Sequence, residues 1–142
     1  MTKGTGVEVF FWDEQGYKPF VYYNDWQTAI LNWEPFFDPQ NLGVIEQHKN
    51  TDEVFVLLTG KAILFTITPL GEITTHDMVP GAIYNVKQGV WHNLTSTKSA
   101  KWIIVESRDT DKTDTSTRRL LETEKEEIKN SFPLWVTELN LE

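Results

Sequence analysis

One stretch decides the fold of this chain: Glu46-Gln47-His48-Lys49-Asn50-Thr51-Asp52-Glu53, followed by Val54-Phe55-Val56-Leu57-Leu58-Thr59 and then Gly60. Glu46 and His48 are two residues apart, so in an extended segment their side chains project from the same face. Residues 49–52 are polar and turn-prone, so the next strand can fold back and bring Glu53 to that face. The stretch therefore predicts two adjacent strands whose carboxylates and imidazole could grip a small cation.

Short β-branched and aromatic segments recur on both sides of this stretch, separated by turn-forming residues such as Gly71, Gly81 and Gly89. The predicted strands are 7–12, 19–23, 28–33, 42–48, 53–58, 62–68, 72–77, 82–86, 91–96 and 101–107. Residues 34–41 contain Pro35 and Pro39, so they predict a loop with buried aromatics or a single helical turn. Many short strands joined by tight turns indicate an all-β fold, either an antiparallel sandwich or a closed barrel.

Length and composition predict one folded domain over residues 1–142. Of the 142 residues, 39% are hydrophobic and 13% aromatic, which is enough for a sizeable core. The net charge of −8, without a basic cluster, argues against binding to nucleic acid or an anionic membrane, because phosphate groups need clustered positive charge. The chain has no cysteine, which excludes disulfides and thiolate chemistry. Neither a signal peptide nor a membrane span is evident, so we expect a cytoplasmic protein.

The character of the chain changes after Arg108. Residues 109–116 are polar and predict a linker, and residues 117–129 have apolar side chains at helical spacing, which predicts a short amphipathic helix. Pro133 ends this helical pattern. The tail over residues 134–141 is expected to dock Trp135 on the barrel or on a second subunit.

A second motif lies downstream, in Gly81-Ala82-Ile83-Tyr84-Asn85-Val86-Lys87-Gln88-Gly89-Val90-Trp91-His92-Asn93. Together the two stretches resemble the cupin family, whose motifs are G-x5-H-x-H-x3-4-E-x6-G and G-x5-P-x-G-x2-H-x3-N. The second histidine of the first motif matches His48, its glutamate Glu53 and its closing glycine Gly60. The histidine of the second motif matches His92. The resemblance implies a cupin-type jelly roll, a double-stranded β-helix barrel with its core at about residues 42–107 and a short C-terminal helix.

Several positions depart from the family pattern. Glu46 stands where the first histidine is expected, Lys87 replaces the proline, and Ser96 occupies the place of the closing asparagine. Only two residues lie between Gly43 and Glu46, whereas the family has five residues between the glycine and the first histidine. The departure at Glu46 matters most, because it adds a carboxylate to the expected ligand set.

The resemblance implies that Glu46, His48, Glu53 and His92 bind a divalent metal ion. Two carboxylates would neutralise its charge, which favours manganese or iron, with zinc possible. Four protein ligands on an octahedral ion leave two positions for water or substrate, which is a catalytic geometry. Glu46 and Glu53 are the candidate catalytic acid or base.

Each of these assignments has a simpler alternative. His48 and Glu53 could form only a polar pair at the barrel mouth, Glu46 could support a ligand without binding the metal, and Asp52 competes with Glu53. His76 is expected to be a surface or strand residue.

Three further residues are candidates for substrate binding: Lys87, Tyr84 and Trp91. Lys87 could anchor an anionic substrate or could be a solvated turn lysine. Tyr84 and Trp91 could line a pocket, although core packing is the simpler role for an aromatic side chain.

Two function classes follow. The first is a small-molecule enzyme with lyase- or isomerase-like chemistry on a carboxylate- or carbonyl-bearing metabolite, and residues 53–60 and 79–94 are locally similar to the ureidoglycolate lyase family. The second is a non-catalytic, metal-free cupin that binds a small polar ligand or a sugar. In either class we expect a homodimer, because the apolar N-terminal segment and the tail with Phe132 and Trp135 expose aromatic surface.

Overall fold

Alternating burial along the central strands shows why the chain forms two layers. In β4 (Glu53–Thr59) and β9 (Lys101–Ser107), the side chains of Phe55, Leu57, Trp102 and Ile104 are buried, whereas the residues between them stay partly exposed. A period of two places one face of each strand toward an interior. The two strands pair directly and antiparallel, with Phe55 opposite Ile104.

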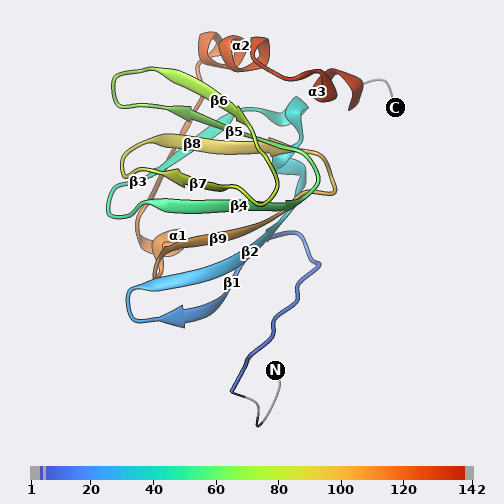
Figure 1. The fold of residues 1–142 in the computed structure, drawn as a ribbon. Helices are drawn as coiled ribbons and strands as arrows, with labels where there is room; N and C mark the ends of the chain where they lie inside the picture. The colour runs from blue at the N-terminus through green and yellow to red at the C-terminus, as the bar shows by residue number, and fades with distance from the viewer. Residues whose placement is uncertain (1–3, 5, 140–142) are drawn as a thin grey trace.

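The computed structural model describes residues 4 and 6–139, which form two five-stranded antiparallel sheets (Figure 1). The first sheet has the order β1 (Gly16–Tyr23), β2 (Trp26–Asn32), β9, β4 and β7 (Ile83–Val86). The second sheet has the order β10 (Thr115–Arg119), β3 (Val44–His48), β8 (Trp91–Ser96), β5 (Ala62–Ile67) and β6 (Ile73–Asp77). The helical elements are η1 (Pro35–Phe37), η2 (Pro39–Asn41), α1 (Thr110–Thr113), α2 (Glu122–Asn130) and α3 (Leu134–Leu139).

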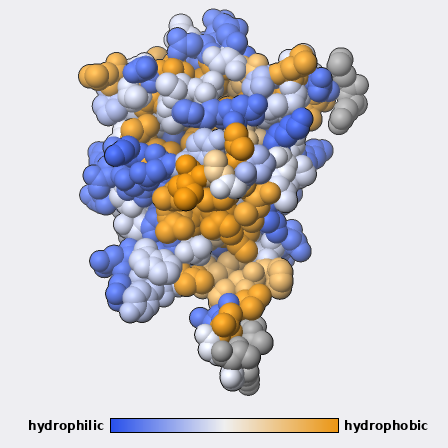
Figure 2. Space-filling model, viewed as in Figure 1, coloured by the Kyte–Doolittle hydropathy of each residue, from blue (hydrophilic) through white to orange (hydrophobic). Residues whose placement is uncertain are grey.

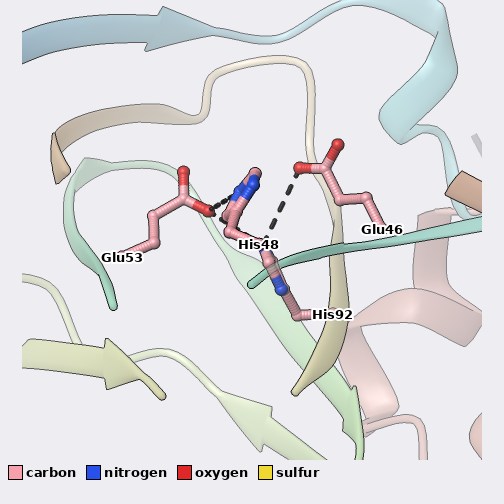
Figure 3. Close-up of side chains that lie close together, drawn as sticks. All are labelled: Glu46, His48, Glu53 and His92. Carbon is pink, nitrogen blue, oxygen red and sulfur yellow. Dashed lines mark hydrogen bonds and ion pairs between the residues drawn. The ribbon is translucent and has the colours of Figure 1, made fainter. Parts of the chain in front are cut away.

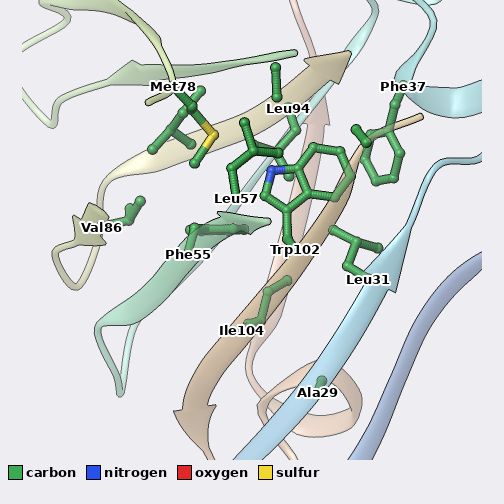
Figure 4. Packing of buried hydrophobic residues seen from close by; sticks show 13 residues of the cluster. Ala29, Leu31, Phe37, Phe55, Leu57, Met78, Val86, Leu94, Trp102 and Ile104 are labelled. Atoms are coloured by element: carbon green, nitrogen blue, oxygen red, sulfur yellow. The ribbon is translucent and has the colours of Figure 1, made fainter. Parts of the chain in front are cut away.

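The main core lies between the two sheets (Figure 4). Trp102 of the first sheet is fully buried, and its ring lies 5.5 Å from that of Phe37 in η1. Leu64 of β5 and Leu94 of β8 belong to the same cluster from the second sheet. Burial of these large side chains is the main favourable contribution to folding.

A close backbone approach explains the closing glycine of the first motif. Gly60 has φ +78°, and a Cβ added to it would lie 2.7 Å from the backbone nitrogen and Cα of Ala100. Both the left-handed backbone and the contact require glycine. This turn therefore fixes how β4 leads into β5.

The outer face of the second sheet is covered by the C-terminal helices. Ile45 and Phe65 pack with Leu120 and with Ile128 of α2, and all four side chains are buried. Trp135 of α3 packs against Ile63 of β5 and donates its indole N–H to Asp77 Oδ1 at 3.1 Å. The tail therefore docks on its own barrel, which is one of the two outcomes predicted for Trp135. Residues 140–141 of the predicted tail lie outside the described residues.

Two sequence-based predictions of secondary structure are wrong. Residues 7–12 form no strand, because Phe10 and Trp12 stack beside Phe20 instead of entering a ladder. The predicted linker and the start of the predicted helix instead contain α1 and β10, so α2 begins at Glu122 rather than at Thr117. The β-branched residues of β10 pair with β3, whose edge would otherwise be open.

The rest of the all-β prediction is confirmed, with strand positions within a few residues. Residues 35–41, predicted as a loop or a single helical turn, form the two short turns η1 and η2. Among residues 4 and 6–139, each helix is too short or too polar to cross a bilayer.

Candidate functional site

Four side chains converge inside the barrel, and they are the four that the motifs predicted (Figure 3). Glu46 and His48 project from β3, His92 from β8 and Glu53 from the start of β4. Glu46 lies directly opposite His92 in the β3–β8 ladder. One ligand atom from each side chain lies within 4.8 Å of all the others, so this group could hold a metal ion.

The two histidines point the same ring nitrogen at one carboxylate oxygen. Nε2 of His48 lies 2.9 Å from Glu53 Oε1, and Nε2 of His92 lies 2.8 Å from that atom. Nδ1 of His92 lies 3.0 Å from the carbonyl oxygen of Val90, which can only accept a hydrogen bond, so Nδ1 carries the proton. In the neutral ring, Nε2 of His92 therefore carries no proton, and its lone pair points at the Glu53 carboxylate. This contact is repulsive unless a cation lies between the two atoms or Nε2 is protonated as well.

The Nδ1 atom of His48 also faces oxygen atoms, at longer distances than the Nδ1 atom of His92. Its Nδ1 lies 3.4 Å from the carbonyl oxygen of Asp114 and 3.3 Å from Thr115 Oγ1. Such partners orient an imidazole and leave its other nitrogen for a metal. They come from the segment around β10, which was predicted to be a linker.

The charges of the group shift its pKa values strongly. Burial alone would raise the pKa of Glu53, but hydrogen bonds and charge from His48 and His92 outweigh it and lower this pKa to about 2. Burial alone would lower the pKa of His48, but Glu53 outweighs it and raises this pKa to about 9. The pKa of His92 is raised for the same reason. Without a metal, the raised pKa values favour the protonated form of both histidines beside an ionised Glu53.

Glu46 differs from the other three residues in its exposure. Its side chain is 34% exposed, and its Oε1 lies 3.7 Å from Nε2 of His92, beyond hydrogen-bond distance. Burial and the nearby charge of Glu53 raise the pKa of Glu46. A partly exposed carboxyl group with a raised pKa can exchange a proton with a ligand.

A cavity of about 240 Å³ adjoins these residues. Its lining residues are Tyr17, Leu31, Glu34, Phe36, Phe37, Glu46, His48, Glu53, Phe55, His92, Asn93, Leu94, Ile104, Glu106, Asp111 and Thr115. Apart from the two histidines and Tyr17, the ionisable side chains in this lining are carboxylates, with neither lysine nor arginine among them. The volume suits a small metabolite.

Glu106 faces the site from β9 and was missed in the sequence analysis. It lies opposite Glu53 in the β4–β9 ladder, and its Oε1 accepts a 2.6 Å hydrogen bond from the hydroxyl of Tyr17. Gln27 donates to Tyr17 at 2.8 Å and to Asp111 at 2.9 Å. Burial and the charge of Glu53 raise the pKa of Glu106 to about 8. The available signal was its parity, because Trp102, Ile104 and Glu106 alternate on the inward face of a predicted strand.

The residues predicted to bind substrate lie away from the cavity lining. Lys87 is exposed in the turn before β8, and the Tyr84 hydroxyl accepts a hydrogen bond from the backbone of Val79. Trp91 packs on the outer cluster, beneath the guanidinium of Arg118. These three assignments gain no support from the site geometry and stay predictions.

The competing residues also lie outside the group. Asp52 is turned outward, where it accepts hydrogen bonds from Asn85 Nδ2 and the backbone N–H of Gln88. His76 is exposed on β6, as expected.

Comparisons with known proteins agree with this architecture. No family model matches the chain. It is 31% identical over 87 residues to ureidoglycolate lyase 2 from Rhizobium meliloti (strain 1021), which covers 57% of this chain and 53% of that protein. The chain therefore spans about half the length of this relative.

Two solved structures share the fold. A variant of oxalate decarboxylase from Bacillus subtilis superposes with a TM-score of 0.56 at 17% identity, over 82% of this chain and 36% of that one. The capsular polysaccharide assembling protein CapF from Staphylococcus aureus gives 0.54 at 16% identity, over 83% and 33%. Such low identities show the fold alone. This protein therefore has the cupin fold, as its two motifs predicted.

Proposed function

We propose that this protein is a metal-dependent lyase or isomerase that acts on a small carboxylate- or carbonyl-bearing metabolite in the cavity. One observation carries the proposal: Nε2 of His48 and Nε2 of His92 converge on Glu53 Oε1 at 2.9 and 2.8 Å, while the Nδ1 of each ring faces other groups. This is how histidines are presented to a metal ion. When both imidazoles are neutral and both carboxylates are ionised, the four side chains carry two negative charges, which suit a divalent cation.

The donor set bears on the identity of the ion. Two carboxylates and two imidazoles favour manganese or iron, and zinc also accepts these ligands. When bound, the ion would polarise a carboxylate or carbonyl oxygen of the substrate. Since neither lysine nor arginine lines the cavity, an anionic substrate would depend on that ion for positive charge.

The protein groups divide the remaining work. Glu46, with its raised pKa and its partly exposed side chain, suits the role of acid or base better than Glu53, whose oxygen is engaged by two histidines. Glu106 is held through Oε1 by Tyr17, and among the described residues its buried Oε2 has no hydrogen-bond partner. A polar group of the ligand would complete that hydrogen bonding. Ureidoglycolate is the first substrate to assay, because of the relative reported above.

The test is metal analysis of protein purified without an affinity tag. We expect one divalent ion per chain, and we expect a His48→Ala, His92→Ala double variant to lose it, with affinity reduced at least about 100-fold. His76→Ala is the matched control, because His76 is the third histidine of the chain and is exposed. Protein that folds but binds no added manganese, iron or zinc would contradict the proposal.

A metal-free binding protein is the second candidate. It is favoured by one observation: the raised histidine pKa values allow Glu53 to be satisfied by two charged imidazoles without an ion. In that case the protein would bind small polar ligands equally well with and without a chelator.

A further inference from the structure

The strands β4 and β9 carry acidic side chains on their inner face and apolar side chains on their outer face. Glu53 and Glu106 lie opposite each other in the ladder and are each 5% exposed. The outer face is an apolar area (Figure 2), to which these two strands contribute Val54, Val56, Ile103 and Val105. Acidic side chains are seldom buried without a partner. The inward position of both carboxylates therefore requires positive charge inside the cavity.

Glu53 has such partners in the two histidines, whereas Glu106 does not. Oε1 of Glu106 accepts the hydrogen bond from Tyr17, but among the described residues its buried Oε2 has no hydrogen-bond partner. Nε2 of His48 lies 3.9 Å from this oxygen, beyond hydrogen-bond distance, and is already directed at Glu53 at 2.9 Å. A buried acceptor without a donor is costly, so Oε2 marks a place for a hydrogen-bond donor of the ligand.

The polar side chains around Tyr17 have no donor to spare. The hydroxyl of Tyr17 donates its proton to Glu106, and Nε2 of Gln27 donates to Tyr17 and to Asp111. Oγ1 of Thr115 donates to a backbone carbonyl oxygen at 2.9 Å. Each of these protons is therefore engaged inside the protein, and what this part of the cavity offers a ligand is acceptor oxygens.

Two further carboxylates lie beside Tyr17 and line the same cavity as Glu106. Asp111 is joined to Tyr17 through Gln27. Oε2 of Glu34 lies against Gly16, where an added Cβ would be 2.7 Å from it. Among the described residues, only the four converging side chains are close enough to one another to hold a metal ion. Glu34, Glu106 and Asp111 therefore surround space for a larger group than a bare ion.

We infer that Glu34, Glu106 and Asp111 bind a positively charged nitrogen group of the ligand, an ammonium or an amidinium group. The inference rests on the proposed function in one respect, because it takes the carboxylate end of the ligand to face the metal ion. The substrate is then a zwitterion rather than a dicarboxylate.

The charges of the cavity agree with such a ligand. A divalent ion would neutralise the two carboxylates among the four converging side chains, which leaves Glu34, Glu106 and Asp111 in excess. A second carboxylate on the ligand would be repelled by these three side chains, whereas a positive nitrogen would be attracted to them. A positive charge beside Glu106 would also favour its ionised form, which accepts hydrogen bonds with both oxygens.

The test compares pairs of carboxylates that differ only at the end away from the carboxylate. β-Alanine, γ-aminobutyrate and δ-aminovalerate carry an ammonium group where butyrate, pentanoate and hexanoate carry a methyl group. We expect at least one ammonium compound to bind manganese-loaded protein at least about 10-fold more tightly than its methyl partner, because hydrogen bonds between ionised groups are strong in a buried site. Isothermal titration calorimetry measures the affinities. Succinate, with a second carboxylate, should bind more weakly than γ-aminobutyrate.

Glu106→Gln identifies the residue responsible. The amide keeps the shape of the side chain and can still accept from Tyr17, yet the preference for ammonium should fall below about 3-fold while metal remains bound. Asp111→Asn is a second variant if Glu106→Gln does not fold, because Asp111 is exposed and an amide oxygen can still accept from Gln27. It should lower the preference in the same direction. Glu72→Gln, exposed in the turn before β6, is the matched control and should leave the preference unchanged.

Metal uptake is measured separately, so that two kinds of failure can be told apart. Protein that binds metal but has equal affinity for the ammonium and methyl compounds, or that prefers succinate, would overturn this inference and leave the proposed function in place. Protein that prefers the ammonium compounds but takes up no metal would contradict only the proposed function. A preference that is unchanged in folded Glu106→Gln and in Asp111→Asn would also overturn the inference.

Discussion

The two walls of the cavity differ in how they are built. The imidazole wall consists of Glu46 and His48 on β3 and His92 on β8, which are neighbours in one sheet and come from two local motifs. The carboxylate wall consists of Glu53, Glu106 and Tyr17 on the facing sheet. Glu53 lies opposite Glu106 in the β4–β9 ladder, and Tyr17 donates a hydrogen bond to Glu106 across 89 residues of sequence. We propose that the first wall supplies three metal ligands, that Glu53 of the second wall supplies the fourth, and that Glu106 and Tyr17 set the charge around them.

The largest expected effect comes from Glu53, which lies on the carboxylate wall and contacts both histidines of the other. Glu53→Gln removes the charge that both Nε2 atoms face, so the metal-free protein should lose about 3–5 kcal/mol of unfolding free energy. Urea denaturation in the presence of a chelator measures this loss. Asp52→Asn is the control, because Asp52 is a half-buried neighbour whose carboxylate is turned away from the group. Equal losses of unfolding free energy in the two variants would contradict the prediction that Glu53 stabilises both histidines.

The stability of the metal-free protein should depend on pH, because each wall contains a group whose pKa is shifted by folding. The pKa of His48 is raised from 6.5 to about 9 and that of Glu106 from 4.5 to about 8, so the folded, metal-free protein binds more protons than the unfolded chain. Its stability should therefore fall by a few kcal/mol as pH rises from about 4.5, where Glu106 begins to contribute, to about 9, where His48 loses its proton.

At acid pH, stability should change in the opposite direction and fall as pH is lowered. The pKa of Glu53 is lowered from 4.5 to about 2, so its contribution is present above pH 4.5 and is lost as pH falls toward 2. With metal bound, the alkaline trend should reverse, because protons and metal compete for the histidines. Heat denaturation measured over this pH range, once with metal and once with a chelator, tests whether the two trends have opposite signs. Parallel pH trends in both would argue against histidine ligands.

The smallest effect is expected from the hydroxyl of Tyr17. Tyr17→Phe leaves Glu106 Oε1 without the hydroxyl donor and removes one of the two acceptors of Gln27 Nε2, which should cost roughly 1–3 kcal/mol of stability. Metal affinity should change by less than about 10-fold, because Tyr17 hydrogen-bonds to Glu106 and not to one of the four metal ligands. Tyr22→Phe, on the same strand, is the control, since Tyr22 is 39% exposed. A loss of metal affinity as large as in the histidine double variant would remove the distinction between the walls.

The imidazole wall and most strands could be predicted from the sequence because the information is local. Glu46 and His48 share a face by strand parity, and Gly60 occupies a turn where a Cβ would strike the backbone of Ala100. His92 follows a turn whose Gly89 N–H donates to the His48 carbonyl oxygen, which ties the two motifs together.

The carboxylate wall could not be predicted in the same way. The proximity of Tyr17 to Glu106 follows only from the strand order of the first sheet, which places β1, β2 and β9 side by side. The segment after Arg108 was predicted as a linker because its residues are polar, yet Thr115 lies opposite His48 in the ladder. Polar composition says little about a strand that pairs at an open edge.

The contacts of Asp114 have a consequence for how the centre is assembled during synthesis. Its carboxylate accepts hydrogen bonds from the backbone N–H groups of Lys49 and Asn50, and its carbonyl oxygen lies beside His48 Nδ1. During synthesis, the four converging residues are all added to the chain before Asp114. They are Glu46, His48, Glu53 and His92. The nascent chain therefore holds a complete set of ligands whose scaffold is unfinished, and a fragment ending at Ser107 would keep the ligands yet lack the group that secures their loop.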